Sequence, residues 1–215
     1  MIDHPIHLPR LYAIIDAGLL ANRVPPERLT AEICDFAEAL ARGGVTLLQY
    51  RAKKLSSREM LSHARELRRV LGPDRILIMN DRADLCLAAG FDGIHLGQDD
   101  LSPEGARTVL GNQLWIGVST HNLEQAKRAA ESEADYLAIG PVFATKTKEN
   151  PDPVVGLEGV RAARALTSKP LVAIGGISRA NACSVIEAGA DSVAVIGDLL
   201  TDPAHAAEQF LDLLV

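Results

Sequence analysis

Eight short runs of β-forming residues recur along the chain, with stretches typical of helices between them. Most runs are continuously apolar, which is typical of parallel strands that are covered by helices. The runs occupy residues 11–15, 46–50, 76–80, 93–96, 115–118, 136–140, 171–175 and 192–196. This alternation predicts an α/β fold, a single (β/α)8 TIM barrel over residues 1–215. The length of 215 residues leaves little room for inserted domains.

The segments between the runs support the barrel. Apolar residues recur every three or four positions in residues 31–43, 56–72, 122–134 and 178–190. In the second of these, Glu59 follows Ser56 by three positions, which predicts a capping box. The alternative is an open doubly wound sheet, which is disfavoured because no GxGxxG turn follows the first run.

Composition excludes several classes of function. The net charge of −6 argues against general affinity for nucleic acid or acidic lipid. No apolar run approaches the roughly 20 residues that span a bilayer, and the first ten residues lack the pattern of a signal peptide. The three cysteines, Cys34, Cys86 and Cys183, are scattered and predict neither disulfides nor a zinc site. We therefore expect a cytoplasmic protein with reduced thiols.

Two acidic residues follow neighbouring β runs. Asp81 follows the third run and Asp100 the fourth, so in a barrel the two carboxylates are expected to face one another. Two carboxylates with few histidines nearby suit Mg²⁺, which keeps several waters and completes its shell with phosphate oxygens. The alternative for each aspartate is an N-cap, of a helix near Arg82 and of a helix near Ser102.

Cationic and glycine residues follow other runs. Arg51 and Lys53 alternate beyond the second run and are expected to project to the same side, where they suit phosphate oxygens. A solvated loop is the alternative for this pair. Gly176 and Gly197 follow the last two runs, in the loops that recurrently bind phosphate in this fold. For these glycines the alternative is a tight strand–helix turn.

The loop after the sixth run is polar and cationic. Thr145, Thr147 and Lys148 supply two hydroxyls and an ammonium between the expected magnesium site and the expected phosphate site. We expect them to bind a second anion, and we expect the loop over residues 144–155 to move and close over bound phosphates.

Taken together, these pieces resemble the thiamine-phosphate synthases, also called thiamine-phosphate pyrophosphorylases. The resemblance runs from about Leu11 to Leu200. It rests on the order and joint presence of LLQYRAK, IMNDRADLCLAAGFDGIHLGQDDL, IGVSTHN, IGPVFATKTK and VAIGGIS. It implies a transferase that joins 4-amino-5-hydroxymethyl-2-methylpyrimidine diphosphate to 4-methyl-5-(2-hydroxyethyl)thiazole phosphate, or to its carboxylated form. Thiamine phosphate and diphosphate are the implied products, Mg²⁺ is the implied cofactor, and the partners are small molecules.

The resemblance also implies residue roles. The pyrimidine diphosphate is implied to contact Gln49, Arg51, Lys53 and Asn80, and its departing diphosphate to contact Ser119 and Lys148. Mg²⁺ is implied to bind Asp81 and Asp100. The thiazole phosphate pocket is implied to comprise Thr145, Thr147, Gly176, Ile196 and Gly197. The implied catalytic residues are Arg51, Lys53, Ser119 and Lys148. This chain has Gly197 where the family often has serine, so one hydroxyl contact to phosphate is expected to be absent.

The implied reaction is a dissociative substitution, in which C–O cleavage runs ahead of attack by the thiazole nitrogen. It requires no protein nucleophile, and we assign no catalysis to His95 or His121. His95 is expected to face the barrel interior or wall, and His121 to be structural or a polar residue beside the site. The alternatives are a thiazole tautomerase-like paralogue, in which His121 carries proton transfer, and a non-catalytic phosphate-sensing barrel. A homo-oligomer is compatible with all three.

Overall fold

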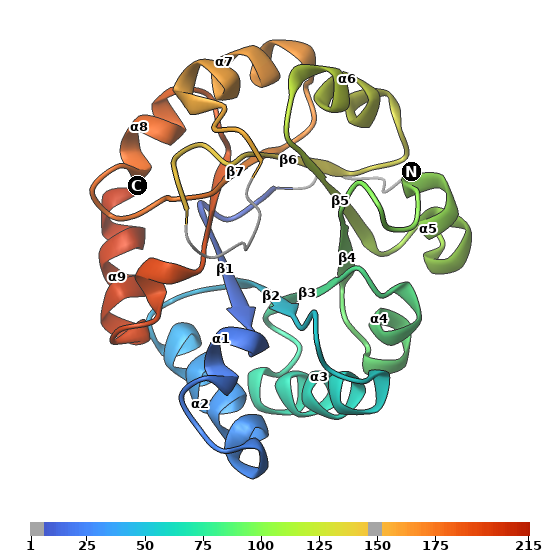
Figure 1. Ribbon diagram of the computed structural model, residues 1–215, viewed down its shortest axis with the longest axis vertical. Coiled ribbons are helices and arrows are strands. Elements are labelled where there is room, and N and C mark those ends of the chain that lie inside the picture. The colour runs from blue at the N-terminus through green and yellow to red at the C-terminus, as the bar shows by residue number, and fades with distance from the viewer. Residues whose placement is uncertain (1–6, 146–151) are drawn as a thin grey trace.

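The computed structural model describes residues 7–145 and 152–215, and it forms a closed barrel of eight parallel strands (Figure 1). The strands follow one another in chain order, and pairing of β1 with β8 closes the ring. They are β1 (Leu11–Asp16), β2 (Leu47–Arg51), β3 (Ile76–Asn80), β4 (Gly93–Leu96), β5 (Trp115–Thr120), β6 (Tyr136–Ile139), β7 (Leu171–Ile174) and β8 (Ser192–Val195). The predicted TIM barrel is confirmed. Thr147 and Lys148 lie outside the described residues.

Helices form an outer ring around the strands (Figure 1). They are α1 (Ala17–Ala21), α2 (Leu29–Arg42), α3 (Ser57–Leu71), α4 (Ala83–Ala89), α5 (Pro103–Leu110), α6 (Leu123–Glu131), α7 (Gly156–Leu166), α8 (Ala182–Glu187) and α9 (Pro203–Leu213), with the short 3₁₀ helices η1 (Pro26–Arg28) and η2 (Gly197–Leu199). The capping box of Ser56 and Glu59 at the start of α3 is confirmed. Among the described residues, no helix is both long and apolar enough to cross a bilayer.

Two of the predicted helices are shorter than the sequence pattern suggested. The helix predicted over residues 178–190 is observed only as α8. A turn precedes α8, and in that turn the backbone N–H of Ser178 donates to Asn181 Oδ1. The prediction over residues 122–134 becomes α6, which ends when Ser132 adopts an extended conformation. A local turn thus replaces the first predicted helical positions in one case and the last in the other.

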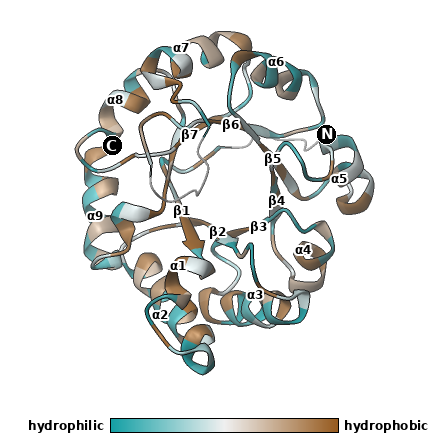
Figure 2. Ribbon diagram, viewed as in Figure 1, coloured by the Kyte–Doolittle hydropathy of each residue, from teal (hydrophilic) through white to brown (hydrophobic). Residues whose placement is uncertain are grey.

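The hydrophobic core has two layers, because side chains of a strand alternate between the two faces of the barrel wall. The outer layer packs the strands against the helices, and the longer helices carry both hydrophobic and hydrophilic residues (Figure 2). The inner layer fills the barrel itself and contains Tyr12, Ile14, Leu47, Ile78, Tyr136, Ala138, Val172 and Ala194. Inward positions nearer the carboxyl ends of the strands are therefore available for polar side chains.

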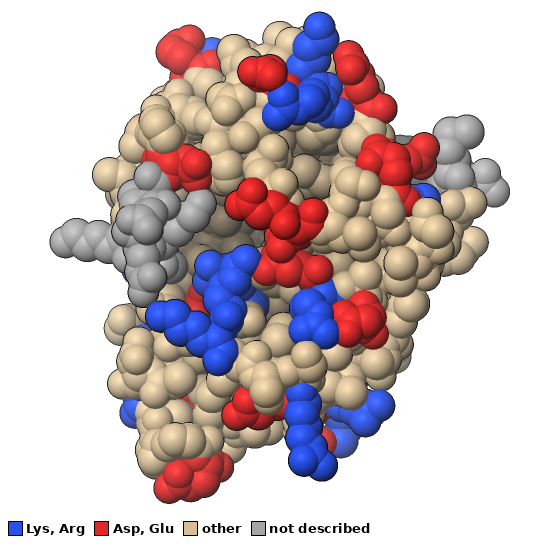
Figure 3. All heavy atoms as spheres, turned by 45° about the vertical axis from the view of Figure 1, so that its right-hand side comes forward, with Lys and Arg blue, Asp and Glu red and all other residues tan. Residues whose placement is uncertain are grey.

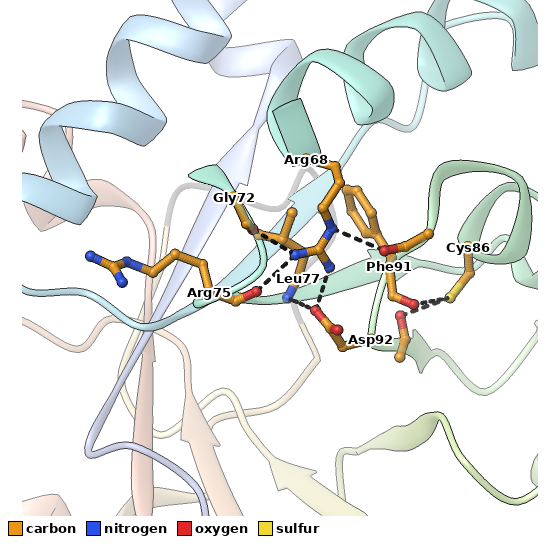
Figure 4. A network of polar contacts seen from close by, with 9 residues as sticks. Arg68, Gly72, Arg75, Leu77, Cys86, Phe91 and Asp92 are labelled. Carbon is orange, nitrogen blue, oxygen red and sulfur yellow. Dashed lines mark hydrogen bonds and ion pairs between the residues drawn. The ribbon is translucent and has the colours of Figure 1, made fainter. Parts of the chain in front are cut away.

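An arginine–aspartate staple ties α3 to the amino ends of β3 and β4 (Figure 4). Arg68, in the last turn of α3, donates to the carbonyl oxygens of Gly72 and Arg75 and to the carboxylate of Asp92, just before β4. The same carboxylate accepts from the backbone N–H of Leu77 in β3 at 2.7 Å. One side chain thus satisfies carbonyls beyond the helix end and holds two strands in register.

The staple occurs twice more around the barrel. Arg107 of α5 pairs with Asp135 before β6, and Arg164 of α7 pairs with Asp191 before β8. Each aspartate again accepts from a backbone N–H of the preceding strand, at 2.7 Å in both cases. These three staples stiffen the amino end of the barrel. They leave the carboxyl ends of the strands for binding and chemistry, as is usual in this fold.

Candidate active site

A cavity of about 640 Å³ lies at the carboxyl ends of the strands. In the space-filling view, Asp and Glu side chains lie beside Lys and Arg side chains around a hollow on this side of the molecule (Figure 3). Every predicted site residue that the structure describes lines this cavity: Gln49, Arg51, Lys53, Asn80, Asp81, Asp100, Ser119, Thr145, Gly176, Ile196 and Gly197. Residues that are far apart in sequence therefore share one chamber.

Asp81 and Asp100 form hydrogen bonds with the backbone of β4 and of the loop that follows it, and neither caps a helix. Asp81 adopts a left-handed conformation with φ of 62°, and its N–H donates to the carbonyl oxygen of His95 at 2.9 Å. Asp100 Oδ2 accepts from the N–H of Gly97 at 2.7 Å. The N-caps of α4 and α5 are Arg82 and Ser102. The alternative interpretation of the two aspartates as caps is therefore wrong.

The two carboxylates form an acidic pair. Burial raises the pKa of Asp81, the ammonium of Lys53 opposes that rise, and hydrogen-bonding contact with the Asp100 carboxylate adds to it. Lys53 Nζ lies 2.5 Å from Asp81 Oδ2. Two carboxylates that close together repel one another, and a cation between them relieves that repulsion. In this structure the Lys53 ammonium supplies part of that positive charge.

This donor set fits Mg²⁺ better than a transition metal. Within residues 7–145 and 152–215, no group of three or more His, Cys, Asp or Glu side chains could hold a metal ion together. The acidic pair offers hard oxygen ligands only. Mg²⁺ is typically bound by one or two carboxylates and takes its other ligands from water and substrate phosphates. Asp81 and Asp100 are thus the residues that could hold it.

Arg51 is oriented by an aspartate that the sequence analysis overlooked. Its guanidinium donates to Asp16 Oδ2, and the Asp16 side chain is only 7% exposed. Asp16 Oδ1 also accepts from the N–H of Leu19 at 3.1 Å and so caps α1. The carboxylate is fixed by the helix and in turn fixes the arginine. Asp16 directly follows the first β run, so the rule that found the other site residues could have found it.

The loops after β7 and β8 bring backbone close to the cavity. Gly176 has a φ of +66°, and a Cβ there would lie 2.6 Å from the carbonyl oxygen of Ala144. Only glycine fits that position. A Cβ on Gly197, in contrast, would meet no atom within 4 Å. The first loop is therefore sterically closed to side chains, whereas the second has room for one.

Two further polar side chains, His121 and Gln98, line the wall of the cavity. His121 Nδ1 lies 2.7 Å from the carbonyl oxygen of Gly140 and 3.5 Å from Asp152 Oδ2. Gln98 Nε2 donates to the carbonyl oxygen of Ser119 at 2.6 Å. His121 thus joins the loops after β5 and β6, as expected for a structural residue.

A row of hydrogen-bonded side chains crosses the barrel at the base of the cavity, and we call it the floor row: Gln49, Tyr12, Tyr136, His95 and Ser119. Successive distances are 2.9 Å, 3.0 Å, 3.1 Å and 2.8 Å. Burial lowers the pKa of His95 from 6.5 to about 4, and burial raises the pKa of Tyr12 and Tyr136. The prediction that His95 faces the barrel interior is confirmed. The two tyrosines were missed, because within a β run they look like ordinary core residues.

The buried His95 is expected to make the metal-free protein less stable in acid. Folded His95 takes up a proton only near pH 4, whereas the unfolded chain does so near pH 6.5. The unfolded state binds more protons between these values, so the free energy of unfolding falls as the pH drops from about 6.5 to about 4, by up to roughly 3 kcal/mol. Urea unfolding in EDTA at several pH values should show a shallower dependence for His95→Gln than for wild type. His205→Gln, at an exposed histidine, should keep the wild-type dependence. Equal slopes for all three proteins would contradict the expectation.

Comparisons with known proteins agree on one family. A sequence model of the family described as thiamine monophosphate synthase matches residues 11–199. The chain is 62% identical over 209 residues to a thiamine-phosphate synthase of Koribacter versatilis, covering 97% of each chain. It is 45% identical over 208 residues to one of Chloroflexus aurantiacus, covering 96% of this chain and 92% of the relative. Its structure is similar to a thiamine phosphate pyrophosphorylase from Pyrococcus furiosus, with a TM-score of 0.79, 34% identity and 95% coverage of both chains.

Proposed function

The chain belongs to the thiamine monophosphate synthase family, and we propose that its barrel cavity joins 4-amino-5-hydroxymethyl-2-methylpyrimidine diphosphate to 4-methyl-5-(2-hydroxyethyl)thiazole phosphate or its carboxylated form. The products are thiamine phosphate and diphosphate, so the enzyme is a transferase. One observation carries the assignment: a single cavity is lined by an acidic pair, two cations and two glycine loops. One barrel domain over residues 1–215 would suffice for the reaction. A cytoplasmic location and a homo-oligomer stay predictions from the sequence.

We assign the pyrimidine diphosphate to the β1–β5 side of the cavity. Arg51, already oriented by Asp16, offers its remaining guanidinium N–H groups to phosphate oxygens. Lys53 lies at the acidic pair and adds a second positive charge. Gln49 of β2 and Asn80 of β3 are buried polar side chains that line the cavity, and they would orient the pyrimidine. Ser119 and Lys148, the latter outside the described residues, would contact the departing diphosphate.

The acidic pair, Asp81 and Asp100, would hold Mg²⁺ beside this diphosphate. When bound there, Mg²⁺ supplies positive charge that stabilises the negative charge developing on the leaving group. Arg51 and Lys53 would also supply positive charge to the leaving group. Asp16 and Asp81 hold these two side chains in place before the substrate arrives. Such preorganised charge needs no rearrangement during the reaction.

We assign the thiazole phosphate to the loops after β6, β7 and β8. Gly176 allows the backbone to approach an anion closely, since no side chain fits there. Thr145, Ile196 and Gly197 line the same part of the wall. Thr147 completes the proposed set and lies outside the described residues. The two substrates would thus meet across the cavity.

The reaction would proceed by cleavage before capture. The bond between the pyrimidine methylene carbon and the diphosphate oxygen breaks, and its electron pair leaves with the diphosphate. The amino-substituted ring stabilises the resulting cation. The thiazole nitrogen then donates its lone pair to the methylene carbon and forms the new C–N bond. No protein nucleophile is needed, and His121 stays engaged with the carbonyl oxygen of Gly140.

Release of diphosphate tests the proposed function. Diphosphate should appear rapidly only when the pyrimidine diphosphate, the thiazole phosphate and Mg²⁺ are all present. Each substrate alone provides a control. Equal release from the pyrimidine diphosphate alone would indicate a hydrolase. Conversion of the carboxylated thiazole phosphate without its partner would indicate the tautomerase-like alternative.

Gly197→Ser is expected to tighten binding of the thiazole phosphate. A Cβ at this position meets no atom within 4 Å, so a serine fits and adds a hydroxyl donor near the phosphate. One added hydrogen bond of about 1 kcal/mol corresponds to a roughly fivefold lower KM for that substrate. Steady-state kinetics with Gly197→Ala as comparison separates the hydroxyl from the added carbon. Equal KM values for the serine and alanine variants would remove this residue from the phosphate site.

A further inference from the structure

The floor row differs from the other polar contacts of the cavity because it runs through the buried interior. Tyr12 is 1% and Tyr136 0% exposed, and His95 is 7% exposed. Its two ends, Gln49 and Ser119, both line the cavity. Each inner member of the row has one hydrogen-bond partner on either side, and each hydroxyl has a single proton to donate. All protons of such a row are therefore donated in the same direction along it.

The direction follows from the donor at the Gln49 end. The Gln49 amide nitrogen donates to the Tyr12 oxygen. The proton of Tyr12 is then donated to Tyr136, and the proton of Tyr136 is donated to His95 Nδ1. An Nδ1 that accepts carries no proton, so the ring is neutral and its proton is on Nε2. Nε2 therefore donates to Ser119 Oγ.

The last proton of the row is the hydroxyl proton of Ser119, and it is directed to the cavity. Ser119 Oγ accepts from His95, and within the described part of the chain His95 is its hydrogen-bond partner. Its own proton is thus available for a ligand. A free serine hydroxyl can rotate and present either a proton or a lone pair, whereas an anion accepts hydrogen bonds only. A serine held as a donor is preorganised for an anion.

We propose that His95, Tyr136 and Tyr12 are positioning residues that hold Ser119 as a hydrogen-bond donor toward the departing diphosphate. This inference deepens the proposed function and rests on the assignment of Ser119 to the diphosphate. None of the three touches the reacting atoms in this scheme. They act through the one hydroxyl at the end of the row.

The barrel interior is shaped to admit this row. Gly117 of β5 pairs in register with Tyr136 of β6. A Cβ at Gly117 would lie 2.0 Å from Tyr136 Cζ. The ring of Tyr136 therefore occupies the space that any larger residue at position 117 would fill. The tyrosine hydroxyl reaches both Tyr12 and His95 because residue 117 has no side chain to displace the ring.

The chain also contains a matched control. Tyr50 lies on the outer face of β2 and its hydroxyl is 2.8 Å from Nδ1 of His63 in α3. This outer pair has the same chemistry and similar burial, but it faces a helix and not the cavity. Removal of its hydrogen bond should cost stability as removal of the inner one does. It should leave the chemistry untouched.

The tautomer of His95 is the first test. Long-range ¹H–¹⁵N spectra of the ¹⁵N-histidine-labelled full chain report which ring nitrogen carries the proton, and His95→Gln identifies the signals. We expect a protonated Nε2 and an unprotonated Nδ1 for His95. In Tyr136→Phe the donor to Nδ1 is lost, and the Nδ1 signal should shift. A protonated Nδ1 in the wild-type chain would mean that the row runs the other way, with Ser119 donating inward, and would overturn the proposal.

Kinetics is the second test. Tyr136→Phe and His95→Leu should each lower kcat about tenfold with little change in KM, because a ground-state contact is kept while a transition-state donor is lost. His95→Gln, whose amide nitrogen can replace Nε2, should recover most of that loss. Tyr50→Phe and His63→Leu should leave kcat unchanged. A wild-type kcat in folded His95→Leu, or equal losses in the inner and outer variants, would overturn the proposal. If the wild-type chain released no diphosphate, the proposed function would fail, whereas the tautomer would still report the direction of the row.

Discussion

Replacement of Asp81 or Asp100 by Ala is expected to lower the rate of diphosphate release on the order of 10²-fold or more. Either change removes one of the two carboxylates of the acidic pair, and with it the site proposed for Mg²⁺. The diphosphate would then depart without its main counter-charge. Steady-state rates at saturating substrates over a range of Mg²⁺ concentrations measure the effect.

Asp84→Ala is the matched control for the acidic pair. Asp84 lies in α4, close in sequence to Asp81, and its side chain is 62% exposed and paired with Arg82. It should retain the wild-type rate. Thermal unfolding adds a second readout, because Mg²⁺ with diphosphate should raise the Tm of wild type and of Asp84→Ala but not of Asp81→Ala. Near-normal Mg²⁺-dependent turnover in both Asp81→Ala and Asp100→Ala would refute the metal assignment.

A pyrimidine diphosphate that carries an electron-withdrawing fluorine substituent is expected to react much more slowly than the natural substrate. If C–O cleavage leads, the ring bears positive charge in the transition state, and fluorine destabilises it. A destabilisation of about 3 kcal/mol corresponds to a rate loss on the order of 10²-fold. Single-turnover measurements isolate the coupling step from product release. An electron-donating substituent at the same position serves as the control and should not slow the step. An unchanged rate for the fluorinated compound would exclude cleavage before capture.

The barrel itself was predictable because its strands are encoded locally. Most runs are apolar on both faces, as parallel strands under helices require, and each predicted run overlaps an observed strand. Errors occurred at the ends of elements. The first run was read as far as Ile15, so Asp16, the last residue of β1 and the partner of Arg51, was not considered.

The acidic pair illustrates a different limit. An aspartate after a strand is equally suited to cap the next helix or to face a ligand, and the local sequence does not separate the two. Contacts with other strands decide the matter, since Lys53 from beyond β2 reaches Asp81 and the two carboxylates meet each other. Only the expected barrel, which placed neighbouring strand ends together, favoured the interpretation in which the two carboxylates face one another.

The floor row could not be predicted from sequence patterns. Tyr12 and Tyr136 are 124 positions apart, and their contact depends on which face of each strand turns inward when the barrel closes. A tyrosine within an apolar run carries no local sign of its hydroxyl partner. Gly117 opposite Tyr136 was the available signal, since a glycine within a strand often marks a close approach by another group.

Closure of the loop after β6 over bound phosphates stays a prediction. Thr147 and Lys148 lie outside the described residues, and so does half of the segment expected to close over phosphates, residues 144–155. Timed trypsin digestion with peptide mapping tests that expectation. Cleavage after Lys146 or Lys148 should slow when thiamine phosphate, diphosphate and Mg²⁺ are added together. Equal cleavage with and without these ligands would contradict closure.

The most direct measurement of the proposed site is a crystal structure of the enzyme with thiamine phosphate, diphosphate and Mn²⁺ in place of Mg²⁺. Mn²⁺ accepts the same oxygen ligands and gives an anomalous signal that identifies its position. We expect one anomalous peak between the carboxylates of Asp81 and Asp100, with diphosphate oxygens beside Arg51 and Lys53. The phosphate of the product should lie at the loops that contain Gly176 and Gly197. A metal peak away from the acidic pair, or a product bound outside the cavity, would contradict the site proposed here.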